Sequence, residues 1–495
     1  MNELEQSLKK YKLDELLILL AKKSLELYIK GEFIEKVEWV RVIGSFQQSF
    51  KQLLPVWGLA ELSYLAIKNS NDYRSIIPVM NDIYRLNDLL AKVTDEEAKI
   101  ALKESGKERL RTHILHGIPQ TQFWWQKIIR TKDLYYSFLR YYVLLAEIPP
   151  KYFPHSTLPT KVLESITGFD IKVFSQLLFL GYVYIYTKKP LVDFRLDKGI
   201  KKIIPAATEE NLKKTLSFFI GDYTYYRRDN HLYNPLFLKP VILTDTGKLI
   251  ISNAFIWARK FYEGIYWILR DYYRKQDSQE FINQFGYYYE RYVQELLEFY
   301  LKPGQFEKLE KLEKSKDGKN ADWLVYTNKF LLLIEQKSSL MSIALKREYP
   351  EAKDLKEYLK NFKEAYLQLN SASLHLEGNS RRIIKLVLHF EKLYFKESNI
   401  KREIESLCKG EVKDLLNYFL IDTEEFEKLI QVLSEKEELF NQIVERKVEY
   451  EQSPPPPSFG IDFENIIRDT VKWQEIKFLE EYKKYFPGNE DASSI

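Results

Sequence analysis

The chain has 495 residues, 45% of them hydrophobic, enough for buried cores in roughly two to four domains of ordinary size. Basic and acidic side chains nearly balance, 75 against 71, so the net charge of +4 neither requires nor excludes a local basic groove. The single cysteine, Cys408, excludes a disulfide framework and a cysteine-based zinc site, and it leads us to expect a reducing, cytoplasmic location.

Residues 1–200 are predicted to form a helical regulatory or interaction region. Near the N-terminus Leu13, Leu16, Leu17 and Leu20 recur at helical spacing, and further helical patterns follow. The N-terminal segment carries acidic as well as basic residues, unlike a signal peptide, and no apolar run approaches the ~18 residues of a membrane span. We expect these helices to bind a partner protein or a second copy of the chain, and we expect no membrane.

Residues 201–275 are predicted to be a connecting segment. Val241–Thr244 and Lys248–Ser252 alternate in polarity around an Asp-Thr-Gly turn sequence, which predicts a hairpin. A helix is expected at 254–274.

Two other groups of side chains have alternative interpretations. One interleaves aromatic and basic residues that could stack on bases and contact phosphates, or that could simply pack a loop on the core. Its members are Tyr223, Tyr225, Tyr226, Arg227 and Arg228. The other, His113 and His116, has the spacing of helical metal ligands, but without an acid on that face an ordinary histidine pair is favoured.

Residues 318–339 carry the pattern with the most chemistry. Two apolar runs flank Asn328 and Lys329, and asparagine tolerates the positive φ of a two-residue hairpin turn. With that turn, the pairing brings Asp322 opposite Glu335, with Cβ atoms about 4.5–5.5 Å apart. Lys337 then lies on the same face, because side chains alternate along a strand.

This arrangement is unfavourable as structure alone. Asp322 and Glu335 would repel each other beside an apolar sheet, and the pKa of one should rise. A divalent cation would offset the repulsion, since Mg2+ prefers carboxylate oxygens, water and substrate phosphate. Lys337 could then orient or deprotonate the attacking water. The alternative is an ordinary acid–lysine pair at a strand end.

Asp322 followed by Glu335-Gln336-Lys337 resembles the PD-(D/E)XK nuclease superfamily, in which an Asp on one core strand is paired with an acid-x-Lys on the next. Ala321 replaces the proline that often precedes the first acid. The resemblance covers about 280–425 and implies the element order α-β-β-β-α-β. It also implies that Asp322, Glu335 and the Gln336 backbone carbonyl hold Mg2+, or Mn2+ as a substitute.

The resemblance further implies a third acid from the helix before the sheet. Helical geometry over 278–301 places Glu290 at the margin of the apolar stripe, whereas Glu295 and Glu298 are expected to point well away from it. Gly286, one turn before Glu290, weakens the helix by roughly 1 kcal/mol, a cost that close approach of sheet, metal or phosphate would explain. We therefore choose Glu290, an ordinary solvated carboxylate being the alternative.

Hydrophobic periodicity predicts the remaining elements of the core. A helix is expected at 351–374, with Gln368 on its flank at a polar position that the family sometimes uses near the site. Strands are expected at Ile383–Phe390, which contains His389 as a core residue, and at Tyr418–Ile421.

Asp422 should cap the helix that follows the last of these strands, with Glu425 completing a capping box. The tail at 426–495 should be helical, with a proline-rich linker at 453–458.

Together these interpretations predict an α-rich α+β protein whose restriction-endonuclease-like core, a mixed sheet flanked by helices, spans 276–425. The resemblance implies a metal-dependent endonuclease acting on nucleic acid, DNA rather than RNA, and suggests a restriction or anti-phage defence effector. Two alternatives stay open. One is a catalytically inactive nuclease-like scaffold that binds nucleic acid or a partner protein, and the other is an RNA-cleaving toxin.

Overall fold

The structure is a computed structural model of the chain. It describes residues 3–43, 46–112, 125, 131–184, 189–192, 198–228, 231, 233–309, 320–340, 352–376, 378–392, 397–408, 410–412, 415–452, 463–471 and 475–485. The expected proline-rich linker at 453–458 and the His113 and His116 pair lie outside these residues. The molecule is 64% helical and contains mixed sheets flanked by helices.

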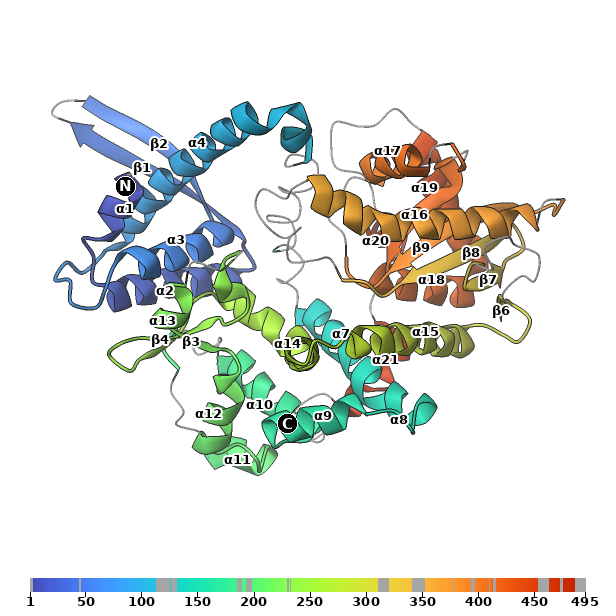
Figure 1. Cartoon of the computed structure of the whole chain (residues 1–495), viewed down its shortest axis with the longest axis horizontal. Helices are drawn as coiled ribbons and strands as arrows, with labels where there is room; N and C mark the ends of the chain where they lie inside the picture. Colours follow the sequence, from blue (N-terminus) through green and yellow to red (C-terminus); the bar gives the residue numbers. More distant parts are fainter. Residues whose placement is uncertain are drawn as a thin grey trace.

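The N-terminal elements form one end of the molecule (Figure 1). In chain order they are α1 (Glu3–Leu8), α2 (Leu13–Lys30), β1 (Ile34–Ile43), β2 (Phe46–Pro55), α3 (Val56–Asn69) and α4 (Met80–Thr112). The antiparallel β1–β2 hairpin is a correction to the predicted helical region at 1–200, in which no strand was expected at 34–55. The segment Ile34–Ile43 is rich in β-branched residues and is followed by Gly-Ser, a strand-and-turn signal that the helical interpretation missed.

Helices also make up the middle of the chain. They are α7 (Thr131–Tyr142), a π-helical turn (Val143–Glu147), α8 (Ile148–Tyr152), α9 (Pro159–Thr167), α10 (Ile171–Val183), α11 (Lys198–Ile203) and α12 (Glu209–Ser217). Among the residues described, no single helix is both long and apolar enough to cross a membrane. The bent pair of α9 and α10 reaches that length and apolar composition when its two helices are taken together.

A small sheet and a long helix lead to the C-terminal half. The sheet contains β3 (Ile220–Asp222), β4 (Val241–Leu243) and β5 (Leu249–Ile251), and the antiparallel β4–β5 pair confirms the predicted hairpin. After β3 comes the short α13 (Tyr223–Tyr226). The predicted helix after the hairpin is α14 (Ala254–Lys275). Asn253 caps its N-terminus, because the Asn253 side chain accepts hydrogen bonds from the backbone N–H groups of Phe255 and Ile256.

The opposite end of the molecule is built on a five-stranded sheet of order β10-β9-β8-β7-β6 (Figure 1). Its strands are β6 (Phe306–Lys308), β7 (Trp323–Tyr326), β8 (Phe330–Lys337), β9 (Arg382–His389) and β10 (Tyr418–Asp422). The first three are antiparallel, and β8, β9 and β10 run parallel.

Helices connect and cover this sheet. They are α15 (Glu280–Tyr300), α16 (Ala352–Leu374), α17 (Glu397–Cys408), α18 (Thr423–Glu435), α19 (Glu437–Gln452), α20 (Phe463–Thr470) and α21 (Lys477–Glu480). The predicted order of one helix, three strands, one helix and one strand is therefore present. Asp422 caps α18 and forms the predicted capping box with Glu425.

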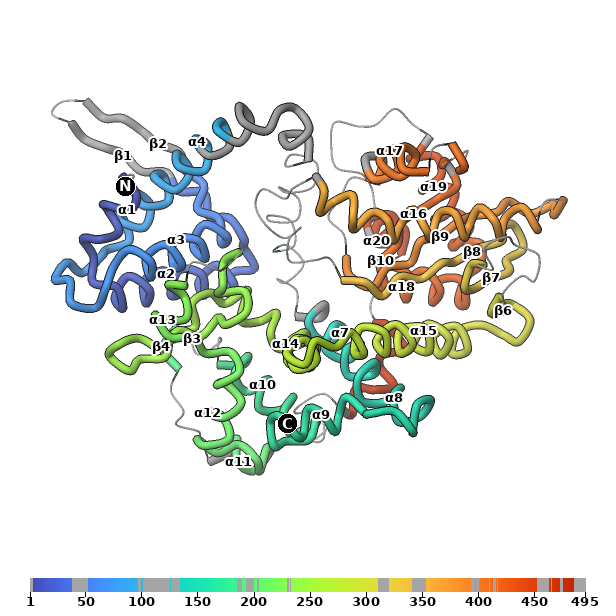
Figure 2. The backbone as a smooth tube through the Cα atoms, in the orientation of Figure 1, coloured from blue at the N-terminus to red at the C-terminus, as the bar shows by residue number. Residues whose placement is uncertain are grey.

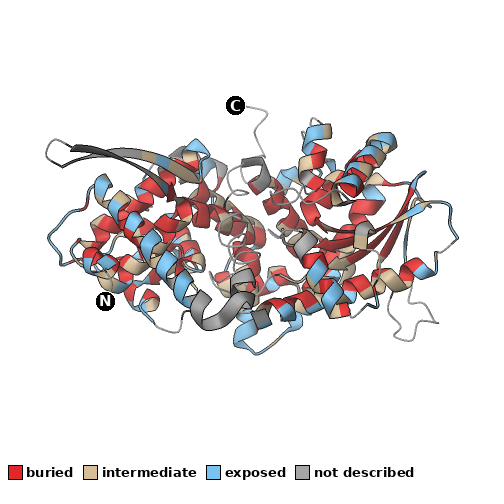
Figure 3. Ribbon diagram, turned by 90° about the horizontal axis from the view of Figure 1, so that it is seen from above, coloured by how far each residue is buried: buried red, intermediate tan, exposed pale blue. Residues whose placement is uncertain are grey.

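Both faces of the sheet are covered, as the apolar sequence of β8 requires. Leu331 and Leu333 pack in a cluster with α16 and α17, whereas Leu332 and Ile334 belong to the larger core that includes α15 and α18. Apart from the edge strand β6, the strands of this sheet are accordingly mostly buried (Figure 3). Along β8 itself, only the last two residues, Gln336 and Lys337, are not fully buried.

The larger core extends from the sheet into the N-terminal half of the part of the chain that the structure describes. It includes Leu16 of α2, Phe138 of α7 and Phe261 of α14 as well as residues of α15 and the sheet. Figure 2 shows the chain passing from α14 through a short turn at 276–279 into α15, between the two ends of the molecule. The predicted domain boundaries near 200 and 275 are thus crossed by one continuous apolar cluster.

Candidate active site

The β7–β8 hairpin has the predicted register. Trp323 pairs with Ile334 and Tyr326 with Leu331, and the backbone N–H of Thr327 donates to the carbonyl oxygen of Phe330 at 3.0 Å. The turn itself differs from the expectation, because Asp277 is the only non-glycine residue with positive φ in the part of the chain described. Instead, the Thr327 hydroxyl oxygen accepts from the backbone N–H of Phe330 at 2.8 Å and so holds the turn by a side-chain contact.

Asp322 lies where β7 leaves the ladder. Its N–H donates to the carbonyl oxygen of Ile334 at 2.9 Å, and its own carbonyl oxygen accepts from the N–H of Leu309 at 2.9 Å. The ladder with β8 is then continued by the side chain: Asp322 Oδ2 accepts from the backbone N–H of Gln336 at 2.8 Å. This charge-assisted bond fixes the carboxylate beside the end of β8.

Glu335 and Lys337 converge on the same side of the sheet. Lys337 Nζ donates to Glu335 Oε1 at 2.7 Å and to Gln368 Oε1 of α16 at 3.2 Å. Gln368 Nε2 in turn donates to the backbone carbonyl of Asn320 at 3.3 Å. Gln368, expected only from the resemblance, thus links the lysine to the segment that leads into Asp322.

Burial dominates the electrostatics of the two acids. The Glu335 side chain is 3% exposed, and its Oε2 is buried without a hydrogen-bond partner among the residues described. Burial, reinforced by the charge of Asp322, raises the pKa of Glu335 to about 8 although Lys337 opposes the shift. Burial also raises the pKa of Asp322, against the lowering effects of the Gln336 N–H and of Lys337.

Glu290 lies nearby on α15 but has a different partner. Its carboxylate pairs with Lys308 of β6. Gly286, one turn earlier, sits against the chain leaving β8, because an added Cβ would lie 3.3 Å from Ser338 Oγ. This close approach of the chain after β8 accounts for a glycine at that position.

The other two acids considered on this helix behave differently from each other. Glu298 is exposed, as expected. Glu295, expected to point away from the apolar face, is buried: it pairs with Lys151 at 2.6 Å and accepts from Tyr482 at 3.3 Å. The reason is tertiary, since α8 and the C-terminal helices cover that side of α15.

The donor set partly fits the expected metal ion. Asp322 and the unpartnered Glu335 Oε2 supply carboxylate oxygens, and the Gln336 carbonyl points to the same edge of β8 as its N–H, which bonds Asp322. Among the described residues no group of three His, Cys, Asp or Glu side chains is arranged to hold a metal ion. Two carboxylates and a carbonyl suit Mg2+, which keeps several water ligands.

Most of the aromatic and basic residues at 223–228 have structural roles. Tyr223 and Tyr226 are buried, and Arg227 donates to the carbonyl oxygens of Ile67 and Ser70, as expected for a loop packed on the core. Tyr225 is half-buried, with Arg228 and Lys239 over its ring.

His389 is a core residue, as predicted, and pairs with Lys337 in the β8–β9 ladder. Its Nδ1 contacts the backbone carbonyl of Glu391, and burial lowers its pKa.

Three residues near the acids were not anticipated from the sequence. Lys308 pairs with Glu290, Ser338 contacts Gly286, and Trp323 Nε1 donates to Gln336 Oε1 at 3.2 Å. The contact between Trp323 and Gln336 could have been predicted, because Trp323 directly follows Asp322 in the hairpin. No local pattern identifies the other two, because both depend on how α15 packs against the sheet.

Comparison of the chain with protein-family models, characterised proteins and solved structures found no match to any of them.

Proposed function

We propose that the protein is a metal-dependent nuclease whose core is of the restriction-endonuclease type. The observation that supports this most directly is the convergence of Asp322, Glu335 and Lys337 at the end of an otherwise apolar strand. Burying two acids and a lysine there costs desolvation free energy, and a phosphodiesterase site would explain why all three are present.

Each residue has a defined part in this proposal. Asp322, Glu335 and the Gln336 carbonyl would hold Mg2+ or Mn2+, which when bound supplies positive charge against the phosphate and lowers the pKa of bound water. Lys337 Nζ donates to Glu335 and Gln368. It would orient the attacking water or stabilise the negative charge that develops on the phosphate. Gln368 is a positioning residue that limits the rotamers of this lysine.

DNA is the substrate that we favour over RNA, by analogy with the resemblance, and a restriction or anti-phage role is consistent with a nuclease core joined to a large helical region. An RNA-cleaving toxin would use the same residues. One observation favours the inactive scaffold: Glu290 forms an ion pair with Lys308 and does not converge with Asp322 and Glu335.

Cleavage assays with Mg2+ and Mn2+ on plasmid, single-stranded DNA and RNA in competition test the proposal. We expect Asp322→Asn and Lys337→Gln each to lower the cleavage rate by at least about 10²-fold while nucleic-acid binding persists. Glu405→Gln, an exposed carboxylate of α17, is the matched control and should cleave normally. Absence of cleavage by the wild-type protein on all three substrates with both ions, together with retained binding, would favour the scaffold.

A further inference from the structure

The ion pair between Glu290 and Lys308 joins the helix before the sheet to the edge of the sheet. Lys308 is the last residue of β6, the edge strand, and its side chain is 47% exposed, whereas that of Glu290 is 24% exposed. Lys308 pairs with Trp323 in the ladder, and its Nζ lies 5.8 Å from the Trp323 ring centroid. Lys308 is therefore paired with the residue that follows Asp322, and it lies beside the proposed site.

The charges of the site explain why a cation is needed at this point. Glu290 lies close enough for its negative charge to act on Asp322. Glu335 is paired with Lys337, so without a second cation Glu290 would be an uncompensated third acid beside two buried ones. Lys308 supplies that cation from an exposed position, where the pair is weak and screened by water.

We propose that Lys308 is a displaceable counter-ion, which holds Glu290 away from the metal ion in the resting protein and contacts nucleic-acid phosphate once Glu290 is released. This inference rests on the proposed function. When a divalent ion binds beside Asp322, Glu290 turns from Lys308 to the ion, and the freed ammonium faces solvent beside Trp323. The strand edge then presents a positive charge to a phosphate group.

The two halves of this exchange are chemically matched. A divalent cation attracts a carboxylate more strongly than a single ammonium does, so the exchange of Lys308 for the ion is favourable for Glu290. Lysine is a long, flexible point charge that binds phosphate, so the freed side chain has a suitable partner at a nuclease site. The Trp323 ring, already within reach of the ammonium, offers it a second contact during the exchange.

Mn2+ binding to the protein without nucleic acid tests the first half. We expect Lys308→Met to bind Mn2+ about two- to fivefold more tightly than wild type, the factor that a partly exposed ion pair contributes. Glu290→Gln in the same background should abolish the gain. Lys302→Met, at an exposed lysine just after α15, is the matched control and should bind Mn2+ as wild type does.

Binding of a short DNA duplex tests the second half. Cleavage must be blocked while Mn2+ is present. Asp322→Asn would block cleavage but would also weaken Mn2+ binding, so we choose Lys337→Gln as the background for this measurement. There Lys308→Met should bind the duplex more weakly and lower the slope of log K against log salt by about 1. Thermal melting of each variant checks that the fold is retained.

The outcomes separate this inference from the proposed function. Mn2+ binding that depends on Asp322 but is unchanged or weakened by Lys308→Met overturns the counter-ion role and leaves the nuclease proposal standing. An unchanged salt slope overturns the phosphate contact. A wild-type protein that binds no Mn2+ overturns both the inference and the metal-dependent nuclease from which it follows.

Discussion

Glu335 is the residue at which stability and the proposed function are most clearly opposed. Its strand is apolar on both faces, and among the residues described its side chain pairs with one cation, Lys337. An ionised carboxyl group in that environment costs the fold free energy, because it gives up hydration for a single ion pair. A residue of this kind is more readily explained by its chemistry than by its contribution to folding.

Glu335→Gln should therefore stabilise the metal-free protein at alkaline pH. The folded pKa of about 8 lies above the ordinary value of 4.5, so the stability that proton binding provides is complete below about pH 4.5 and is lost as pH rises through about 8. Glutamine mimics the protonated acid at every pH. The difference in unfolding free energy should be small at pH 5 and grow to the order of a few kcal/mol by pH 9.

Chemical denaturation in the presence of a chelator, at pH 5, 7 and 9, measures this difference. Glu405→Gln, which removes an exposed carboxylate, serves as the control and should show no comparable pH trend. A Glu335→Gln variant that is less stable than wild type at pH 9 would mean that the carboxylate is well compensated in the fold.

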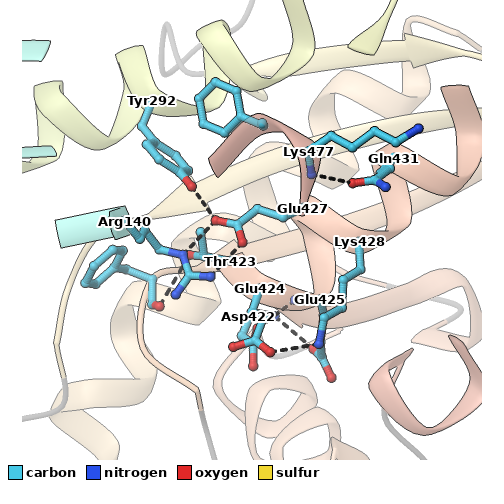
Figure 4. A network of polar contacts seen from close by, with 12 residues as sticks. Arg140, Tyr292, Asp422, Thr423, Glu424, Glu425, Glu427, Lys428, Gln431 and Lys477 are labelled. Atoms are coloured by element: carbon cyan, nitrogen blue, oxygen red, sulfur yellow. Dashed lines mark hydrogen bonds and ion pairs between the residues drawn. The ribbon is translucent and has the colours of Figure 1, made fainter. Parts of the chain in front are cut away.

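Among the elements, α7, α15 and α18 are joined by a buried polar network (Figure 4). Arg140 of α7 donates from Nε and Nη2 to the two carboxylate oxygens of Glu427 in α18, both at 2.6 Å. Tyr292 of α15 donates to the same carboxylate. The Arg140 and Glu427 side chains are 7% and 0% exposed, so their charges are almost fully removed from water.

Replacing Arg140 should be strongly destabilising. Arg140→Met leaves the Glu427 carboxylate buried, with the Tyr292 hydroxyl as its remaining hydrogen-bond partner among the described residues. We expect a loss of about 3–5 kcal/mol in unfolding free energy. Urea denaturation measures the loss, with Arg402→Met as the exposed-arginine control.

The double variant Arg140→Met with Glu427→Leu isolates the cause, because it removes both charges together. It should recover most of the lost stability. A double variant as unstable as Arg140→Met alone would assign the loss to packing and not to the unpaired charge.

Over the whole molecule, the sheet and the helices before it share one core. Phe390, at the end of β9, contacts Tyr141 of α7 and Phe285 of α15 edge-on, with ring centroids 5.4 Å and 5.0 Å apart. Phe285 also meets Tyr266 of α14 at 5.0 Å. The predicted nuclease region therefore buries part of its apolar surface against the chain before residue 276.

This sharing predicts that residues 276–495 alone will not form a stable domain. The isolated fragment would expose the apolar faces that α7 and α14 cover, and we expect it to melt without a cooperative transition and to bind a hydrophobic dye. The full chain should unfold cooperatively in the same calorimetric measurement. A fragment with a sharp transition and native near-ultraviolet circular dichroism would establish an independent domain at the predicted boundary.

The sequence by itself determined what depends on neighbouring residues along the chain. The β7–β8 register followed from two apolar runs and a short loop, and it brought Asp322, Glu335 and Lys337 together. The Asp422 capping box was likewise readable from local spacing. Such features are predictable because hydrogen-bond periodicity within an element or hairpin fixes which side chains share a face.

Only the tertiary structure decided which residues from distant elements meet. It paired Glu290 with Lys308, buried Glu295 and joined Arg140 to Glu427, contacts between elements whose relative placement no local pattern specifies. It also replaced the expected positive-φ turn with a Thr327 side-chain contact. The physical reason is that ion pairs and burial depend on how whole faces pack, and this packing is decided by the summed contacts of the core.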